Sequence, residues 1–557
     1  MKHKSMNLFI AFLILMAIPT FIFAQDIVTV PDQIDGNPVG AINKYIMGDT
    51  TSTGARNNPD RIYRLERGKI YVQDATMEIN FNLTLIADDD DPNNPTRPPM
   101  LVRAYLPDGE LLGLLFHITG DNVNVKFQNL LFQGIPIDRV VGDDWGNAIH
   151  FASNASKLQI DKCIFNGFGA GVLEMYGSTN YRVFLTNNVF RNLVQKVHPF
   201  GGQVQGTGAE FPGDSLVYTN NTILNINAYV LLPNKSIVKY IQFEHNTIFA
   251  SVINPFFIPW ATNAHIKNNI IYGAFSNGQL PTEISEGWYG FDGDVTGLID
   301  IDTIDASAGI NEADRVIEIS NNAYGWPQAI KDYWNSIDSM SATPWMNERT
   351  ASMFADDANY PHLLNDNNVE AEPGFDATME TSVTDSLLLW IQAFRNHGWD
   401  WVGGMLRHYA PNGDIFDIPW PLPENLTYSN TNLATASTDG LHLGDLNWYP
   451  QEKATWLTSI ERKTGEEIPN KFSLSQNYPN PFNPTTVIEF SISETQKVTL
   501  DVYNALGQKV QTLVNKKLSA GSYKYSFNAS KLSTGVYFYK IKTGNSFAQT
   551  KKMLLIK

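Results

Sequence analysis

Three charged side chains in the middle of this 557-residue chain could take part in proton transfer. They are Arg182, Lys239 and Glu244. Elimination from a uronic-acid polymer needs a Lys or Arg to remove the α-proton, a cation to neutralise the carboxylate, and acidic residues to hold a metal. The sequence does not place a complete set of these groups together, and exposed strand faces normally carry charges without catalysis. The sequence therefore does not locate the catalytic residues of an enzyme.

Two acidic runs could bind a calcium ion. One is 88–91, and the other comprises Asp292, Asp294, Asp300 and Asp302, with Asp305 shortly after them. Calcium needs about six to eight converging oxygens, and neither run has the spacing of an EF-hand loop or a nonapeptide calcium repeat. Solvated acidic loops are the favoured interpretation. We therefore predict no cofactor, with calcium as the one metal to consider.

Aromatic residues near strand ends and in inserted loops are candidates for binding a ligand. They are Trp145, Tyr176, Trp260 and Trp288. A flat exposed ring can stack on the face of a sugar, which favours polysaccharide as a ligand. The alternative is that these rings pack inserted segments onto the body of the protein, and the sequence leaves both interpretations open.

An internal repeat indicates the elements that must position these side chains. Seven segments share an apolar residue, a polar one, then Asn or a polar substitute, then apolar residues. They start at residues 127, 160, 185, 218, 243, 266 and 319, so the base period is 23–25 residues. Asn tolerates left-handed backbone geometry, and its amide can bond the equivalent amide one coil away. We predict a ladder of stacked corners formed by Asn129, Asn187, Asn220, Asn268 and Asn321.

This repeat resembles a right-handed parallel β-helix, the architecture of pectate lyases and related polysaccharide-active proteins. The resemblance concerns the fold and covers roughly 60–325. A β-propeller is the competing architecture, but its blades need periods of about 40–50 residues, which the observed spacing contradicts. The fold class predicted for the chain is all-β.

We expect four regions along the chain. They are a signal peptide over 1–24, the parallel β-helix over 25–325, a wrapping region with one helix over 326–465, and a small β-sandwich over 466–557. One coil of the β-helix is expected to lie hidden near residue 290. The helix of the wrapping region is predicted from Thr384 as N-cap to Gly398 as its C-terminal stop.

The first 24 residues have the pattern of a removable export signal. Lys2 and Lys4 precede an apolar run over 8–18, and a small residue, Ala24, lies at the expected cleavage point. The apolar run is short for a membrane anchor, so we expect a protein without a transmembrane segment. The single cysteine, Cys163, lies on a predicted strand and is expected to be buried and inert.

The C-terminal segment resembles a known sorting domain. It begins with Asn-Tyr-Pro-Asn-Pro-Phe-Asn-Pro-Thr-Thr at 477–486 and continues with 502–507, 532–537 and a basic pair at 551–552. These motifs resemble the type A sorting domain of type IX secretion cargo over about 470–557. The resemblance implies that the type IX machinery is a partner and carries the protein to the cell surface or medium. An adhesion module of similar sandwich fold is the alternative.

The charge distribution narrows the choice of partners. The net charge is −17, whereas residues 471–557 contain twelve Lys and three acidic residues, so the body of the chain is strongly acidic. An acidic body repels phosphate backbones, which argues against nucleic acid as a partner. We expect a secreted or cell-surface protein that binds polysaccharide without catalysis. A polysaccharide lyase or glycoside hydrolase of this fold and a structural envelope protein stay open as alternatives.

Overall fold

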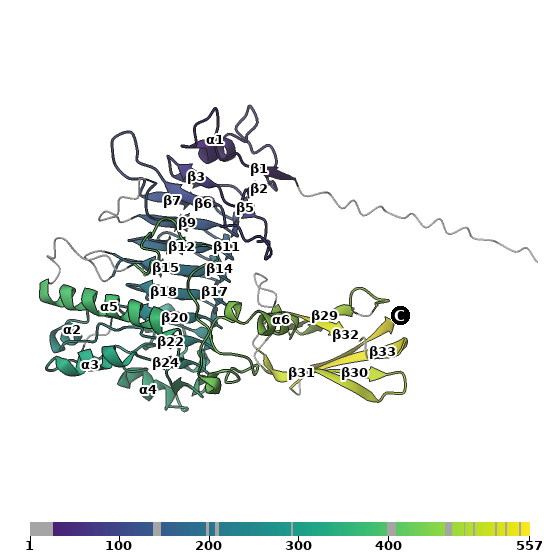
Figure 1. Cartoon of the computed structure of the whole chain (residues 1–557). Helices are drawn as coiled ribbons and strands as arrows, with labels where there is room; N and C mark the ends of the chain where they lie inside the picture. The colour runs from purple at the N-terminus through teal and green to yellow at the C-terminus, as the bar shows by residue number, and fades with distance from the viewer. Residues whose placement is uncertain are drawn as a thin grey trace, which may run out of the picture.

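Three long parallel sheets form the body of the protein (Figure 1). The structure, a computed structural model, describes residues 26–137, 146–195, 200–206, 211–290, 293–397, 408–459, 461–462, 471–483, 485–493, 496–518, 521–529, 532–544 and 547–556. Each strand of a coil pairs in parallel with the equivalent strand of the next coil, so the coils stack along one axis. The predicted all-β fold with a parallel β-helix is confirmed.

Sheet 1 has eleven strands. They are β1 (Ile27–Thr29), β2 (Ile62–Leu65), β5 (Leu83–Ala87), β8 (Asn124–Gln128), β11 (Lys157–Asp161), β14 (Arg182–Thr186), β17 (Ser215–Thr219), β19 (Ile241–Glu244), β21 (Asn263–Lys267), β23 (Val316–Ser320) and β25 (Leu363–Asp366). The seven repeat segments start on consecutive strands of this sheet. Their first residues, from Phe127 to Ile319, pair in register at every step. The irregular spacing in the sequence therefore reflects insertions between coils of constant register.

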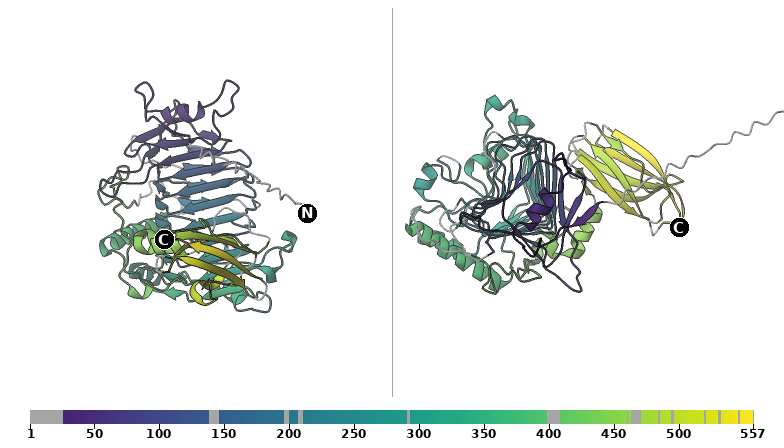
Figure 2. Two further views of the ribbon diagram at one scale, coloured as in Figure 1. Left: turned by 90° about the vertical axis from the view of Figure 1, so that its right-hand side faces the viewer. Right: turned by 90° about the horizontal axis from the view of Figure 1, so that it is seen from above.

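Sheet 2 follows sheet 1 along most of the body, and sheet 3 adds a third side to five of the coils. Sheet 2 contains β3 (Ile70–Gln73), β6 (Met100–Arg103), β9 (Leu131–Gln133), β12 (Ile164–Asn166), β15 (Val189–Leu193), β18 (Thr222–Ile226), β20 (Thr247–Ser251), β22 (Ile270–Tyr272), β24 (Ala323–Gly325) and β26 (Val369–Glu370). Sheet 3 contains β4 (Met77–Ile79), β7 (Leu114–Ile118), β10 (Asn147–Phe151), β13 (Gly171–Glu174) and β16 (Gln203–Gly206). Seen along the axis, the three sheets surround one core (Figure 2).

Inward side chains stack on their equivalents in neighbouring coils. The rings of Phe132 and Phe165 are 4.5 Å apart and nearly parallel, and those of Phe165 and Phe190 are 5.3 Å apart. Ile223 and Ile248 continue the same column, and all five residues are fully buried. Burying a side chain of this size contributes about 1.5–3 kcal/mol, so a column repeated over many coils is a major part of the stability.

Asparagines, all of them buried except the half-buried Asn368, form a continuous ladder at the corner between sheets 1 and 2. The ladder residues are Asn188, Asn221, Asn246, Asn269, Asn322 and Asn368. At each of the five steps the side-chain amide donates to Oδ1 of the next ladder residue at 2.8–3.2 Å. The backbone N–H of the same residue donates to the same oxygen at 2.8–3.1 Å. The amide also reaches a carbonyl of the preceding coil, as from Asn246 to Tyr218 O at 3.0 Å, so these buried amides stabilise the corner.

The residue before each ladder position makes the turn. Asn129, Asn187, Asn220, Asn268 and Asn321, the five corner residues predicted above, have left-handed backbones with φ between 53° and 62°. Their side chains bond outside the ladder, as Asn187 does to Asp161 Oδ1 at 2.6 Å and Asn321 to Ala436 O at 2.7 Å. We expected one residue in each coil to make both the turn and the ladder. In the structure, two adjacent residues share these roles.

The prediction of a further coil near residue 290 is wrong. Strand β21 pairs directly with β23, and β22 pairs directly with β24. The chain between them is an insertion that includes α2 (Pro281–Ser285) and two short 3₁₀ turns, η1 (Ala306–Ala308) and η2 (Glu312–Asp314). Arg315, which is fully buried, anchors it by donating to Ala261 O, Asp302 O and Pro259 O at 2.7–3.2 Å. The long separation between two repeats thus reflects one enlarged coil.

The expectation of one helix between 326 and 465 is also wrong. The described part of this region contains α3 (Gln328–Ser336), α4 (Glu348–Phe354), α5 (Ala377–His397) and α6 (Pro450–Ser459). Helix α5 begins before Thr384, because Asp376 Oδ1 accepts a hydrogen bond from Met379 N at 2.9 Å and caps the first turn. Gly398 lies outside the described residues. Tyr272 on sheet 2 donates to Glu380 on α5 at 3.0 Å, so this helix covers one side of the body (Figures 1 and 2).

A strap, defined here as residues 408–449, returns along the outside of the β-helix. Its first part covers apolar residues on the outer face of sheet 2, where Phe416 and Ile418 pack in one cluster with Val102, Leu131 and Ile164. Its later part follows the asparagine corner. There Thr438 N donates to Asn268 Oδ1 at 2.8 Å, and Asn447 Nδ2 donates to Asn220 O at 2.7 Å. The strap therefore uses the outward polar groups of the corner residues.

The C-terminal residues form a small antiparallel sandwich beside the β-helix (Figure 2). One sheet contains β27 (Glu461–Arg462), β28 (Ser473–Leu474), β29 (Thr485–Ile492) and β32 (Gly521–Asn528). The other contains β30 (Gln496–Asn504), β31 (Lys509–Leu518), β33 (Gly535–Thr543) and β34 (Phe547–Leu555). The sandwich has an apolar core of its own, which includes Phe490, Val502 and Tyr539. At the other end of the chain, α1 (Ala41–Met47) lies at the first coil.

The adjacent residues Asn321 and Asn322 allow the ladder to be tested separately from the turn. We expect Asn322→Ala to destabilise the protein by about 3 kcal/mol, because it removes several buried hydrogen bonds and leaves their partners unsatisfied. Asn321→Gly retains the left-handed turn and should cost less than about 1 kcal/mol. Urea unfolding of both variants measures the difference, and equal losses would contradict the division of roles.

Candidate functional site

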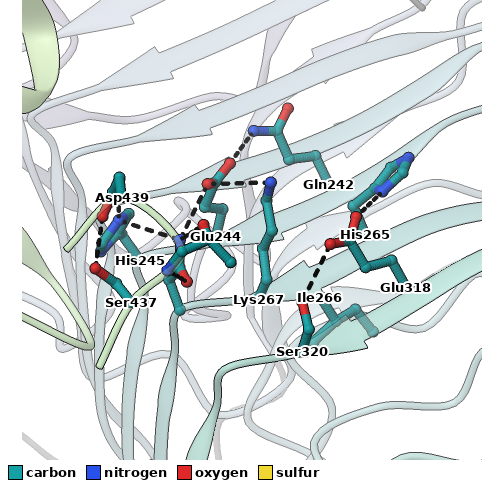
Figure 3. A network of polar contacts seen from close by, with 12 residues as sticks. Gln242, Glu244, His245, His265, Ile266, Lys267, Glu318, Ser320, Ser437 and Asp439 are labelled. Atoms are coloured by element: carbon teal, nitrogen blue, oxygen red, sulfur yellow. Dashed lines mark hydrogen bonds and ion pairs between the residues drawn. The ribbon is translucent and has the colours of Figure 1, made fainter. Parts of the chain in front are cut away.

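A group of polar side chains lies on the outer face of sheet 1, over the strands β19, β21 and β23 (Figure 3). The register pairs Gln242 with His265 and Glu244 with Lys267. It also pairs His265 with Glu318. Alternate residues of a strand point to the same face, so these side chains form two adjacent rows across three strands.

The first row contains a histidine and carboxylate pair. His265 Nδ1 is 3.0 Å from Glu318 Oε2, and the His265 side chain is almost completely buried. Its Nε2 is 3.1 Å from Asn263 Oδ1, which holds the other side of the ring. Burial alone would raise the pKa of Glu318, but the hydrogen bond from His265 and the charge of Lys267 outweigh it and lower the pKa to about 2. Glu318 is therefore a fixed negative charge on this face.

The second row contains an ion pair. Lys267 Nζ is 3.6 Å from Glu244 Oε1, and Gln242 Nε2 donates to Glu244 Oε2 at 2.7 Å. The charge of Glu244 raises the pKa of Lys267 well above its usual value, against the opposing effect of burial. A lysine that acts as a general base needs a pKa near the working pH. Lys267 is held in its charged form and does not meet this requirement.

Beside these rows, the strap brings a carboxylate to the corner of the β-helix. His245 has a left-handed backbone, with φ of 54°, and occupies the corner position that Asn holds in neighbouring coils. Its Nε2 is 3.1 Å from Asp439 Oδ2 on the strap. The possible ligand atoms of Glu244, His245 and Asp439 all lie within 4.8 Å of one another, the one such grouping of His, Cys, Asp or Glu within the described ranges.

The three candidate catalytic residues do not converge. Arg182 begins β14 and Glu244 ends β19, so they lie two strands and four positions apart, roughly 13 Å along the strand direction alone. Lys239 pairs with Asp214 at 2.6 Å and is mostly exposed. Glu244 instead contacts Lys267 on the neighbouring strand β21. The arrangement does not assemble the groups that a lyase requires around these three residues.

Arginine lies where the second acidic run would have to bind calcium. Arg349 pairs with both Asp294 and Asp302, at 2.5 and 2.9 Å. Asp300 is buried and accepts hydrogen bonds from Gly297 N and Asn347 N at 2.5 and 2.7 Å. Burial raises the pKa of Asp300 to about 6. These carboxylates are engaged within the insertion that holds them.

The other residues of the two acidic runs add no support for a calcium site. Asp292 lies outside the described residues. In the first run, Asp88, Asp89 and Asp90 pair with three different basic residues at 2.7–3.5 Å. Because their partners differ, these carboxylates are directed apart and do not share one cation.

The predicted aromatic residues have different environments. Tyr176 is 47% exposed, the highest value among those described, whereas Trp260 is half-buried. Trp288 packs against the core, and its Nε1 donates to Glu286 Oε2 at 2.8 Å. Trp145 lies outside the described residues. Tyr176 is thus the predicted ring best placed to meet a ligand.

Tyr176 adjoins a row of side chains on the outer face of sheet 3 that the sequence pattern did not indicate. Glu78, His117, His150 and Glu174 pair in register across β4, β7, β10 and β13. His117 Nδ1 is 2.8 Å from Glu78 Oε2, and the His117 and His150 rings stack 4.8 Å apart. His150 Nε2 is 3.3 Å from Tyr176 O, which joins this row to the exposed ring. We call these four residues and Tyr176 the sheet 3 row.

The C-terminal sandwich carries the motif that decides how the protein is exported. Asn477 is buried, and its Nδ2 donates to Thr486 Oγ1 at 2.9 Å, which fixes the proline-rich entry against β29. Residues 476–557 match the family described as the secretion system C-terminal sorting domain. The chain is a cargo protein of the type IX secretion system. Such cargo is exported to the cell surface or the extracellular space, as predicted.

Beyond the sorting domain, a comparison with curated proteins finds no match. None of the helices in the described part of the cargo protein has the length and apolar character needed to cross a membrane. Burial strongly raises the pKa of Cys163, whose free thiol lies in the core, as expected for an inert cysteine. The role of the β-helix must therefore be inferred from its own faces.

The depressed pKa of Glu318 predicts a specific dependence of stability on pH. The folded pKa is about 2 and the ordinary value is 4.5, so the ionised form contributes about 3 kcal/mol above pH 5, which is lost as pH falls toward 2. Glu318→Gln removes this contribution. We expect the stability gap between wild type and variant to be constant from pH 7 to 5 and to shrink below pH 4 in urea unfolding.

Glu370→Gln provides the control for this comparison. Glu370 forms an exposed pair with Lys331, at 2.9 Å, and should show a small gap at every pH. A Glu318→Gln gap that is the same at pH 7 and pH 3 would contradict the assigned charge state.

Proposed function

We propose that this secreted cargo protein binds a neutral polysaccharide on the outer face of sheet 3. The observation that carries the proposal is the exposed ring of Tyr176 at the end of a regular row of hydrogen-bonding side chains. Sugars are commonly bound by an aromatic ring under their apolar face together with polar groups at their hydroxyls. The sheet 3 row offers both on one rigid surface.

The repeat of the β-helix suits an extended polymer. Neighbouring strands are about 4.8 Å apart, so one side chain of the sheet 3 row is presented at each step along the axis. Phe211 adds a second aromatic contact, with its ring 6.5 Å from that of Tyr176 in an edge-on arrangement. A chain of sugars lying along the axis would contact several coils at once, and such multiple weak contacts add up to useful affinity.

The charges favour a neutral polymer over an acidic one. Glu78 and Glu174 place two carboxylates in the sheet 3 row, and the body of the chain is acidic. Uronic-acid polymers would be repelled by these charges. Carboxylates and imidazoles are good partners for sugar hydroxyls, since they accept or donate hydrogen bonds in fixed directions.

Two other functions stay as alternatives to binding. A lyase or hydrolase would need an acid and base pair open to substrate, and the cluster on sheet 1 offers a charged Lys267 paired with Glu244 instead. A purely structural envelope protein would have no need for an exposed aromatic ring beside a polar row. These two observations support binding over either alternative.

Export completes the proposal. We place a cleaved signal peptide at 1–24, the β-helix and its wrapping elements in the exported body over 25–465, and the sorting region at 466–557. The protein would reach the periplasm through the signal peptide and leave the cell through the type IX machinery. The first residue of the exported protein is then Gln25. N-terminal sequencing of the secreted protein tests this expectation.

Tyr176→Ala tests the binding face. We expect the secreted protein to be retarded in gels that contain at least one of four neutral polymers, a β-glucan, a xylan, a galactomannan or an α-glucan. Loss of the ring should weaken this binding roughly tenfold or more, corresponding to about 1.4 kcal/mol. Tyr478→Ala is the matched control, because Tyr478 is an exposed tyrosine in the sorting domain, at 81%.

The outcomes separate the alternatives. Binding that Tyr176→Ala leaves unchanged would contradict the assignment of the face. New reducing or unsaturated ends in the polymer would favour an enzyme, and the absence of binding to any of the four polymers would favour a structural protein.

A further inference from the structure

We propose that Glu244, His245 and Asp439 bind a single zinc ion, which ties the strap to the corner of the β-helix. This site is separate from the sheet 3 row and does not depend on the proposed polysaccharide binding. The possible ligand atoms of the three residues lie within 4.8 Å of one another, close enough to surround one metal ion. The strap and the strand contribute ligands 194 positions apart in the chain.

The histidine is already oriented as a metal ligand. His245 is completely buried, and its Nδ1 lies 3.2 Å from Gly444 O. A proton on Nδ1 directed at this carbonyl leaves the lone pair of Nε2 facing Asp439 and Glu244. Histidine ligands of metals usually donate their second ring nitrogen to a backbone carbonyl or a carboxylate in this way.

The two carboxylates are positioned by neighbouring donors. Ser437 Oγ donates to Asp439 Oδ1 at 2.5 Å, and Gln242 Nε2 donates to Glu244 Oε2 at 2.7 Å. Lys267 contacts Glu244 Oε1 at 3.6 Å. Each carboxylate oxygen has two lone pairs, so one oxygen can accept a hydrogen bond and bind a cation at the same time. Fixed outer contacts of this kind hold ligating side chains in place.

The contact between the histidine and the strap needs a proton or a cation. His245 Nε2 faces Asp439 Oδ2 at 3.1 Å, and two acceptor atoms at this distance repel each other unless one of these lies between them. The same nitrogen faces Asn268 Nδ2, a donor, at 3.4 Å. Thr438 N donates to Asn268 Oδ1 at 2.8 Å, so the orientation of this amide is fixed. A metal ion on Nε2 replaces the proton and satisfies Asp439 directly.

The ligand chemistry selects the metal. One imidazole nitrogen and two carboxylates suit zinc, which takes three protein ligands and a water in many sites, whereas calcium prefers oxygen ligands alone. Two carboxylate ligands attract a divalent ion, and Lys267 offsets part of the charge of Glu244. The ion would close the loop between β19 and the strap, and so stabilise the wrapped state of the molecule.

The corner repeat supplies a matched variant. His245→Asn places at this corner the residue that Asn187, Asn220, Asn268 and Asn321 carry at the same left-handed position, so the variant should fold. We expect the chelator-treated full-length secreted protein to bind one zinc ion per chain by calorimetry and elemental analysis. His245→Asn and Asp439→Asn should each weaken binding by at least about 100-fold.

Two readouts keep this result interpretable. His442→Gln is the control, because His442 lies on the strap outside the cluster and pairs with Glu452. It should bind zinc as wild type does, and zinc should raise the unfolding midpoint of wild type and His442→Gln but not of His245→Asn. Zinc binding by His245→Asn and Asp439→Asn equal to that of wild type would overturn the proposal. So would a wild-type protein that retains no more zinc than these variants.

Discussion

The buried asparagine ladder at the corner between sheets 1 and 2 is the interaction on which the rest of this structure depends. An unsatisfied amide in the core would cost several hydrogen bonds' worth of stability, so each coil must stack in a register that places its Asn against the next. Asn188, Asn221, Asn246 and the later ladder residues bond in one continuous line. The sheet 2 strand that follows each of these corners therefore starts in register with the strands above and below it. The regular pairing of sheet 1 from β14 to β25 follows from this register.

The outer faces of sheets 1 and 3 carry different arrangements of side chains. In the cluster on sheet 1, His265 pairs with Glu318 and Lys267 pairs with Glu244, and the strap covers the adjacent corner. The sheet 3 row is open, with Tyr176 exposed at its end. In the sheet 3 row His117 also pairs with Glu78, and Glu174 accepts a hydrogen bond from Asn147, so the exposed ring of Tyr176 is what distinguishes this face. For this reason we assign ligand recognition to sheet 3 and stabilisation to the corner. Export depends on the sandwich at residues 476–557 and is independent of both.

Much of the architecture could be predicted from the sequence, because a coil that stacks must repeat its turn and its apolar positions. The seven segments pair in register as their pattern predicts, but in the Asn-Asn pairs no sequence signal separates the turn residue from the ladder residue. The sequence predicts that the helix begins at Thr384, whereas Asp376 caps its first turn further upstream. His245 carried a signal, as a histidine in an asparagine column. Asp439 had none, because it reaches the corner from a strap 194 residues away. The sheet 3 row follows the spacing of the coils, but it combines Glu and His and so shows no repeated residue type.

Hydrogen exchange of the secreted protein, measured by mass spectrometry with and without a neutral polysaccharide from the panel above, tests the assignment of the binding face most directly. Bound ligand slows local opening of the strands it contacts. The account predicts slower exchange in peptides that cover 114–118, 147–151 and 171–176, and unchanged exchange in peptides that cover 241–244 and 263–267. Protection confined to the sheet 1 peptides, or no protection with any of the four polymers, would contradict it.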